Sequence, residues 1–107
     1  MSELKLTQAD HGKQFEVRQG SAIVIALDEN PTTGYRWAVD KCDDQLLRLR
    51  DSDNAPATGA GMGGGGTRTL TFEAKETGTV RLELKLWREW EGDSSVIKRF
   101  SVTLEIT

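Results

Sequence analysis

The sequence has little cysteine, histidine and proline. Among its 107 residues there is one cysteine, Cys42, one histidine, His11, and two prolines. A single cysteine cannot form an internal disulfide, so the fold does not depend on redox state and the compartment stays open. One histidine and one cysteine with scattered carboxylates lack the ligand spacing of a zinc or calcium site. We therefore expect no metal and no cofactor.

Long apolar runs and an excess of one charge are also absent. No stretch approaches the ~20 apolar residues of a membrane span, and the first residues contain no apolar run of signal-peptide length. We expect a soluble chain without a membrane partner, cytoplasmic as it stands, or periplasmic or secreted if a signal was removed. The 14 Lys and Arg against 17 Asp and Glu give a formal net charge of -3, with both signs interleaved. Nucleic acid is therefore not an expected partner.

Catalysis by a cysteine nucleophile is disfavoured by the surroundings of the one thiol. A nucleophile pair would require Cys42 to meet His11, and the neighbours Asp43 and Asp44 would raise the thiol pKa rather than lower it. The sequence therefore predicts that the protein is not an enzyme.

Apolar side chains at every second position dominate what is present. The alternation is clearest over residues 80–86 and 100–106, and weaker over 21–27, 35–37 and 67–74. This period is typical of strands with one buried face. About seven short antiparallel strands predict one all-β domain spanning 1–107, an immunoglobulin-like β-sandwich without a disulfide, with Trp37 as a core candidate.

Two regions do not follow the alternation. Residues 45–50 are compatible with a short strand or with a helical turn. Residues 51–66 contain a cluster of six glycines and are expected to form one long loop. Ordered loops of this length are uncommon in small domains and tend to be functional or disordered.

Three short segments are candidates for a binding site. The first segment, residues 30–35, is a turn stiffened by proline, with a glycine free to adopt a positive φ. The second segment, residues 63–66, is four glycines whose backbone is open to an extended partner. The third segment, residues 88–90, places a tryptophan beside an arginine, two residues enriched at interface hot spots. The members are Asn30, Pro31, Thr32, Thr33, Gly34 and Tyr35; Gly63, Gly64, Gly65 and Gly66; and Arg88, Glu89 and Trp90.

Each segment alone has a simpler interpretation. The first could be an ordinary turn between strands, the second a flexible linker, and the third a loop whose aromatic side chain folds back on the sandwich edge. A phosphate-binding loop is disfavoured for the second segment, because no Lys-Ser or Lys-Thr follows the glycines and no helix begins there.

Together, and in this order, the segments resemble the chagasin-type inhibitors of papain-like cysteine proteases. That family is marked by an Asn-Pro-Thr-Thr-Gly-aromatic loop, a Gly-x-Gly-Gly loop and an Arg-Pro-Trp loop. The likeness extends over nearly the whole chain, with one departure: Glu89 stands in place of the family's proline. The alternative is a generic immunoglobulin-like interaction or adhesion module, which would leave the co-occurrence of three motifs to chance.

The resemblance implies a reversible inhibitor whose three loops gather at one end of the sandwich and occlude the protease cleft. By resemblance, Thr32 and Thr33 would lie over the catalytic cysteine and histidine. The second segment would pair along the unprimed side, and Trp90 would pack on the primed side with Arg88 donating hydrogen bonds. The implied partner is a papain-like cysteine protease, most of all a cathepsin L-like enzyme, bound by a monomeric inhibitor.

Overall fold

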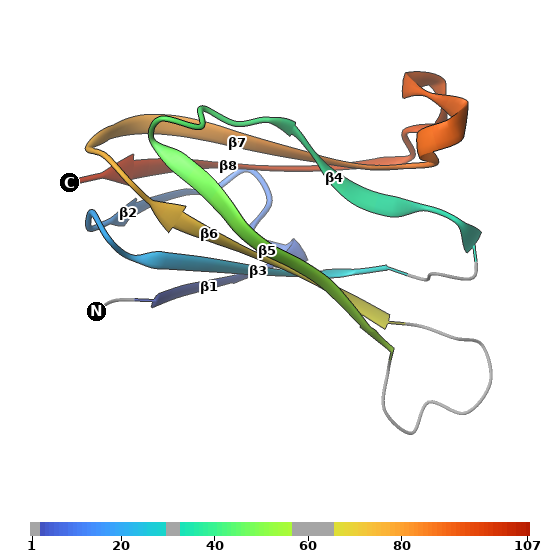
Figure 1. Ribbon diagram of the computed structural model, residues 1–107, viewed down its shortest axis with the longest axis horizontal. Helices are drawn as coiled ribbons and strands as arrows, with labels where there is room; N and C mark the ends of the chain where they lie inside the picture. Colours follow the sequence, from blue (N-terminus) through green and yellow to red (C-terminus); the bar gives the residue numbers. More distant parts are fainter. Residues whose placement is uncertain (1–2, 30–32, 57–65) are drawn as a thin grey trace.

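Two four-stranded sheets packed face to face make up the protein (Figure 1). The computed structural model describes residues 3–29, 33–56 and 66–107. One sheet has the order β1-β3-β6-β5 and the other β2-β8-β7-β4. Helical structure in the described ranges consists of single 3-10 turns, and no helix there is long and apolar enough to cross a membrane. The elements are β1 (Glu3–Thr7), η1 (Gln8–Asp10), β2 (Gln14–Val17), β3 (Ala22–Asp28), β4 (Arg36–Lys41), β5 (Leu47–Pro56), β6 (Gly66–Ala74), β7 (Gly78–Trp87), η3 (Glu89–Glu91), η4 (Asp93–Ser95) and β8 (Lys98–Ile106).

The predicted all-β, immunoglobulin-like sandwich is confirmed, with a difference in strand number and direction. The described ranges contain eight strands rather than about seven, and β1 pairs with β3 and β2 with β8 in parallel. The remaining pairings are antiparallel. The chain passes from one sheet to the other through η1, so β1 and β2 each add to the side of a strand that runs in the same direction. Cys42 is a free thiol, as a single cysteine requires.

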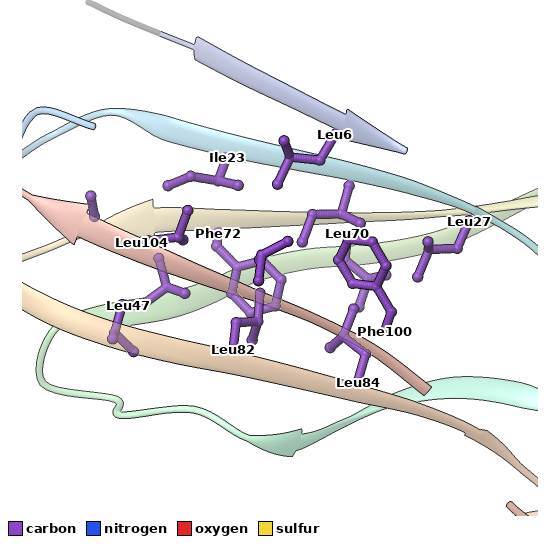
Figure 2. Close-up of a cluster of buried hydrophobic side chains, with 14 of the residues drawn as sticks. Leu6, Ile23, Leu27, Leu47, Leu70, Phe72, Leu82, Leu84, Phe100 and Leu104 are labelled. Atoms are coloured by element: carbon purple, nitrogen blue, oxygen red, sulfur yellow. The ribbon is translucent and has the colours of Figure 1, made fainter. Parts of the chain in front are cut away.

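The inward positions of the alternating strands form one apolar core between the sheets (Figure 2). Each fully buried Val, Leu, Ile or Phe side chain contributes about 1.5–3 kcal/mol relative to an exposed one, which holds the sheets together without a cross-link. Trp37 is buried, as expected from the sequence. The core comprises Leu6, Val17, Ile23, Ile25, Leu27, Trp37, Leu47, Leu70, Phe72, Ala74, Val80, Leu82, Leu84, Leu86, Phe100, Val102, Leu104 and Ile106.

The expectation of one long loop over residues 51–66 is wrong for its first third. Strand β5 continues to Pro56 and pairs with β6 as far as Pro56 opposite Gly66. A strand at the edge of a sheet is held by backbone hydrogen bonds to its single neighbour, so its side chains need not alternate. Residues 57–65 lie outside the described residues. For residues 45–50, the strand interpretation is correct from Leu47 onward.

Both described chain ends lie at one end of the sandwich. Gln19 N–H donates to Thr107 O, and Gly20 N–H donates to Ala74 O, which brings the end of β8 beside the β2–β3 turn. At the opposite end β3 and β7 finish and β4 and β6 begin (Figure 1). We call this second end the loop end.

Candidate functional site

Strand pairing places the boundaries of all three candidate segments at the loop end. Asp28, the last residue of β3, pairs with Thr67 of β6, and Arg36, the first residue of β4, pairs with Trp87, the last residue of β7. The first segment therefore connects two strands of different sheets, the second precedes β6, and the third follows β7. The end of the molecule that carries them is the one opposite the described chain ends (Figure 1).

The described parts of the first and third segments are in direct contact. Arg88 Nε donates a hydrogen bond to Thr33 O at 3.2 Å, and the guanidinium carbon lies 4.5 Å from the centroid of the Tyr35 ring. A cation over an aromatic face is attracted by the ring quadrupole, so Arg88 is held by two neighbouring residues of the first segment. The aromatic residue that ends the first motif thus supports the arginine that begins the third.

Glycine is favoured at position 34 by its backbone conformation. Its φ of 81° lies in the left-handed region that favours glycine. A Cβ atom at this position would also lie only 2.7 Å from Cη2 of Trp90, so the exposed indole ring would have to shift. The Trp90 ring therefore packs directly against the backbone of Gly34. The absence of a side chain in the first segment leaves room for the tryptophan of the third.

Trp90 nevertheless presents most of its surface to solvent. The residue is 72% exposed, whereas Trp87 is half-buried on the outer face of the sheet. The two indoles line a surface hollow of about 260 Å³ together with Gly34, Arg36, Ala38 and Glu89.

The third segment is anchored from behind by polar contacts that the sequence analysis missed. Ser95 Oγ is buried, accepts the Arg88 N–H at 2.9 Å and donates to Gly92 O at 2.6 Å. Lys85 Nζ forms an ion pair with Asp93 at 3.0 Å and lies 3.6 Å from the centroid of the Trp87 ring. These contacts tie η4 to the start of η3, the 3-10 turn that carries Trp90.

Lys85 also belongs to a charge network on the outer face of the sheet. Its ammonium group lies 3.5 Å from Asp40 Oδ1, and Arg99 lies 2.7 Å from Asp40 Oδ2. The hydrogen bond from Arg99 lowers the pKa of the Asp40 carboxyl, partial desolvation opposes that change, and the charge of Lys85 lowers it further. The network therefore keeps Asp40 ionised and Lys85 paired beneath Trp87.

The second segment is described at its last glycine alone. Gly66 O accepts the Glu29 N–H at 3.0 Å, which ties the start of β6 to the residue before the first segment. The structure thus brings together the described residues of all three segments at the loop end, namely Thr33, Gly34 and Tyr35, Gly66, and Arg88, Glu89 and Trp90. Asn30, Pro31, Thr32, Gly63, Gly64 and Gly65 lie outside the described residues.

Sequence analysis also missed a buried ion pair beneath the loop end, between Glu29 and Arg68. The alternation in the sequence could have revealed this pair. The inward alternation of β3 through Ile25 and Leu27 continues to Glu29, and that of β6 through Leu70 continues back to Arg68. A charged residue at an inward position of two paired strands indicates a buried pair.

The chemistry of the titratable groups does not suit nucleophilic catalysis. The Cys42 Sγ–H donates to Leu47 O at 3.3 Å, and burial together with Asp44 and Asp43 raises the pKa of this thiol to about 11. His11 Nδ1 instead accepts the Ser101 N–H at 3.0 Å. In the part of the chain that the structure describes, no group of three His, Cys, Asp or Glu side chains could hold a metal ion.

Comparison with known proteins agrees with the resemblance seen in the motifs. Chagasin from Trypanosoma cruzi is 30% identical over 105 residues, which cover 94% of this chain and 96% of chagasin. The crystal structure of the cysteine protease inhibitor EhICP2 from Entamoeba histolytica superposes with a TM-score of 0.90 at 22% identity, covering 100% of this chain and 97% of that one. PbICP-C, solved in complex with falcipain-2, gives a TM-score of 0.67 at 13% identity, with 100% of both chains covered.

The family comparison settles the class of protein. The model of the family described as chagasin family peptidase inhibitor I42 matches residues 16–104. It favours the inhibitor over a generic immunoglobulin-like interaction module, and it confirms the prediction of an inhibitor of papain-like cysteine proteases rather than an enzyme. The chain belongs to the chagasin family of peptidase inhibitors.

Proposed function

We propose that this inhibitor acts by filling the active-site cleft of its protease with the three segments of the loop end. The observation that carries the proposal is the direct contact between the first and third segments. Arg88 Nε donates a hydrogen bond to Thr33 O, and the Trp90 ring packs against Gly34. Gly66, the last residue of the second segment, is bonded to Glu29, the residue that precedes the first segment. Three clustered loops can supply the roughly 1,200–2,000 Å² of total buried area that specific interfaces need.

Each segment has a separate role in this proposal. Thr32 and Thr33 cover the catalytic cysteine and histidine without presenting a scissile carbonyl to the thiolate, so nothing is cut. The glycines at 63–66 pair with the unprimed side of the cleft as an extended substrate does. Trp90 packs on the primed side, and Arg88 donates hydrogen bonds there. Thr33 and Trp90 are both solvent-exposed, as a contact surface must be.

Preorganisation supports tight binding by so few residues. Each rotamer-rich side chain that becomes ordered on binding costs about 0.5–1.5 kcal/mol. Arg88 is already ordered by Thr33 O, by the Tyr35 ring and by an ion pair with Glu91 at 3.2 Å. Much of the ordering cost is therefore removed before the protease arrives.

The proposed partner is a cathepsin L-like member of the papain class, bound by one inhibitor molecule that acts as a monomer. A protein of the same fold, PbICP-C, is known in complex with falcipain-2, and we propose an analogous one-to-one complex for this chain. Size-exclusion chromatography of the free protein and of its mixture with papain tests the stoichiometry.

Inhibition of papain tests the function, and a substitution in the first segment tests the site. The wild-type protein should abolish hydrolysis of a small fluorogenic peptide by papain. Thr32→Arg should weaken this inhibition by roughly 100-fold, because a bulky charge at the proposed contact with the catalytic groups cannot be accommodated. Its melting temperature should stay close to that of the wild type.

The matched control is Thr79→Arg, the same chemical change on an exposed strand position near the opposite end, facing Glu105 across the sheet. It should leave inhibition unchanged. Undiminished hydrolysis at micromolar wild-type protein would contradict the function. Equal inhibition by wild type and Thr32→Arg would mean that the first segment does not enter the cleft.

A further inference from the structure

Two oppositely charged residues are buried at the base of the loop end. Glu29 is 4% exposed and Arg68 is 9% exposed, although both belong to residue types that are almost never fully buried without a partner. They lie at inward positions of neighbouring chain segments, where the next inward residues toward the core, Leu27 and Leu70, are apolar. Their burial therefore needs a specific explanation.

The pair is held by several short polar contacts. Arg68 Nη2 lies 2.7 Å from Glu29 Oε1, and Arg68 Nε lies 3.1 Å from the same oxygen and 3.2 Å from Oε2. Oε2 also accepts the backbone N–H of Trp37 at 2.7 Å. Arg68 Nη1 reaches Ser52 Oγ at 3.2 Å. A planar guanidinium paired with a carboxylate in this way has one favourable geometry. The pair therefore fixes the distance between the two backbones that carry it, in addition to neutralising both charges.

These contacts join the places where the first two segments leave the sandwich. Glu29 directly precedes the first segment, and Trp37 follows it by two residues. Arg68 follows the second segment by two residues, and Ser52 lies on β5, the strand on the other side of that segment. One carboxylate therefore connects both ends of the first segment to the strand that follows the second. The Glu29 N–H to Gly66 O bond and the Trp37 Nε1–H to Asp28 O bond, at 3.0 and 2.9 Å, reinforce the same junction.

Stability alone does not account for this arrangement. Replacing a buried ion pair by well-packed apolar side chains of similar volume is often neutral or stabilising, because desolvation of the two charges offsets their attraction. What an apolar pair does not provide is a fixed relative position of the backbones that carry it. The pair is therefore better explained by the geometry that it imposes on the loop end.

We infer that Glu29 and Arg68 are positioning residues, which set the first segment against the glycine-rich second segment and so determine the affinity for the protease without touching it. The inference rests on the proposed function, since it is the cleft-filling surface whose shape the pair would set. The third segment has its own anchor in Lys85 and Ser95, so the pair acts on it only through its contact with the first segment.

The test compares inhibition with stability in paired variants. Glu29→Gln/Arg68→Met keeps an acceptor for the Trp37 N–H, fills the arginine volume and leaves no buried charge, so it should fold. We expect its inhibition constant for papain to rise about tenfold or more. Arg68→Lys keeps the positive charge but loses the planar, bidentate donors of the guanidinium, so it should also raise the inhibition constant. The matched control is Val80→Ala, a destabilising core change near Gly78, which should leave inhibition by the folded protein unchanged.

A second readout does not depend on any protease. Amide hydrogen exchange at position 29, whose N–H bonds Gly66 O, should become about tenfold faster in Arg68→Lys than in the wild type, while exchange at Ile25 stays the same. If wild-type protein inhibits papain and the double variant inhibits equally well, the inference is overturned. If the wild type does not inhibit at all, the proposed function fails, and the exchange rates alone decide for or against the positioning role.

Discussion

The two halves of the sandwich are built differently inside. In the half near the described chain ends the buried residues are apolar apart from Ser21, and include Ile23, Phe72 and Leu104. In the loop-bearing half the described interior also contains a buried ion pair, Glu29 with Arg68, and Lys85 is buried with Asp93 on the outer face of the other sheet. The first half, which we call the apolar half, is thus stabilised by apolar contacts, whereas the loop-bearing half adds directional polar contacts to an apolar interior.

This difference follows from what each half has to do. Apolar contacts are non-directional, so they stabilise a sandwich without fixing a loop to within a fraction of an ångström. Hydrogen-bonded charges are directional and hold one geometry, but they add little net stability after desolvation. Substitutions in the apolar half should therefore change stability, and substitutions in the loop-bearing half should change inhibition.

The largest effect should come from the apolar half. Phe72→Ala removes a fully buried ring and should lower the free energy of unfolding by about 3–5 kcal/mol. Chemical denaturation measures the loss, with the milder Phe72→Leu as the control. At a temperature where the variant stays folded, its inhibition of papain should equal that of the wild type. A larger inhibition constant for folded Phe72→Ala would show that stability and inhibition do not depend on separate halves of the sandwich.

An intermediate effect is expected from the most exposed aromatic side chain of the loop end. Trp90→Ala should weaken inhibition by about 2 kcal/mol or more, which is roughly 30-fold, with little change in melting temperature because the ring is already 72% exposed. Inhibition assays and thermal melts measure the two quantities. Ile97→Ala is the matched control, since Ile97 is 55% exposed at the same end and belongs to none of the three segments. Equal losses for both variants would argue against a specific role for the tryptophan.

The smallest effect should be a gain. Glu89 is the first residue of η3, and Arg88 before it is extended with φ of -97° and ψ of 111°, the conformation that proline requires of its predecessor. Proline is favoured at the first position of a helical turn, where the N–H has no intrahelical acceptor. Glu89→Pro should therefore raise stability by about 0.4–1 kcal/mol and tighten papain inhibition slightly. A lower melting temperature would show that the loop conformation depends on the glutamate.

Much of the fold was predictable because apolar alternation reports burial directly. The strands that alternate clearly, such as β7 and β8, were located to within two residues at each end. Strands β1 and β2 were missed, since they are short and lie at sheet edges, and β5 was partly taken for a loop because its polar second half is held by backbone bonds. The parallel pairings depend on where the chain crosses between sheets, which no local pattern records.

The candidate segments were found from their motifs, but the reasons for their geometry were not. Nothing in the spacing of residues 34 and 90 indicates that the tryptophan ring rests on the glycine backbone. The alternation placed Glu29 and Arg68 inward, which indicates a buried charge at each position but does not identify its partner. The partner of a buried charge lies far away in the sequence, here 39 residues along the chain, so it appears only when the sheet is assembled.

The half-buried thiol of Cys42 determines whether this inhibitor can form disulfides with enzymes that use a reactive thiolate. With a pKa raised to about 11, only roughly one molecule in ten thousand carries the ionised form at pH 7. Because disulfide exchange requires a thiolate, Cys42 should neither form a mixed disulfide with the protease nor cross-link two inhibitors. The reducing agents that keep such proteases active should therefore leave the complex unaffected, and dissociation on dilution should be complete.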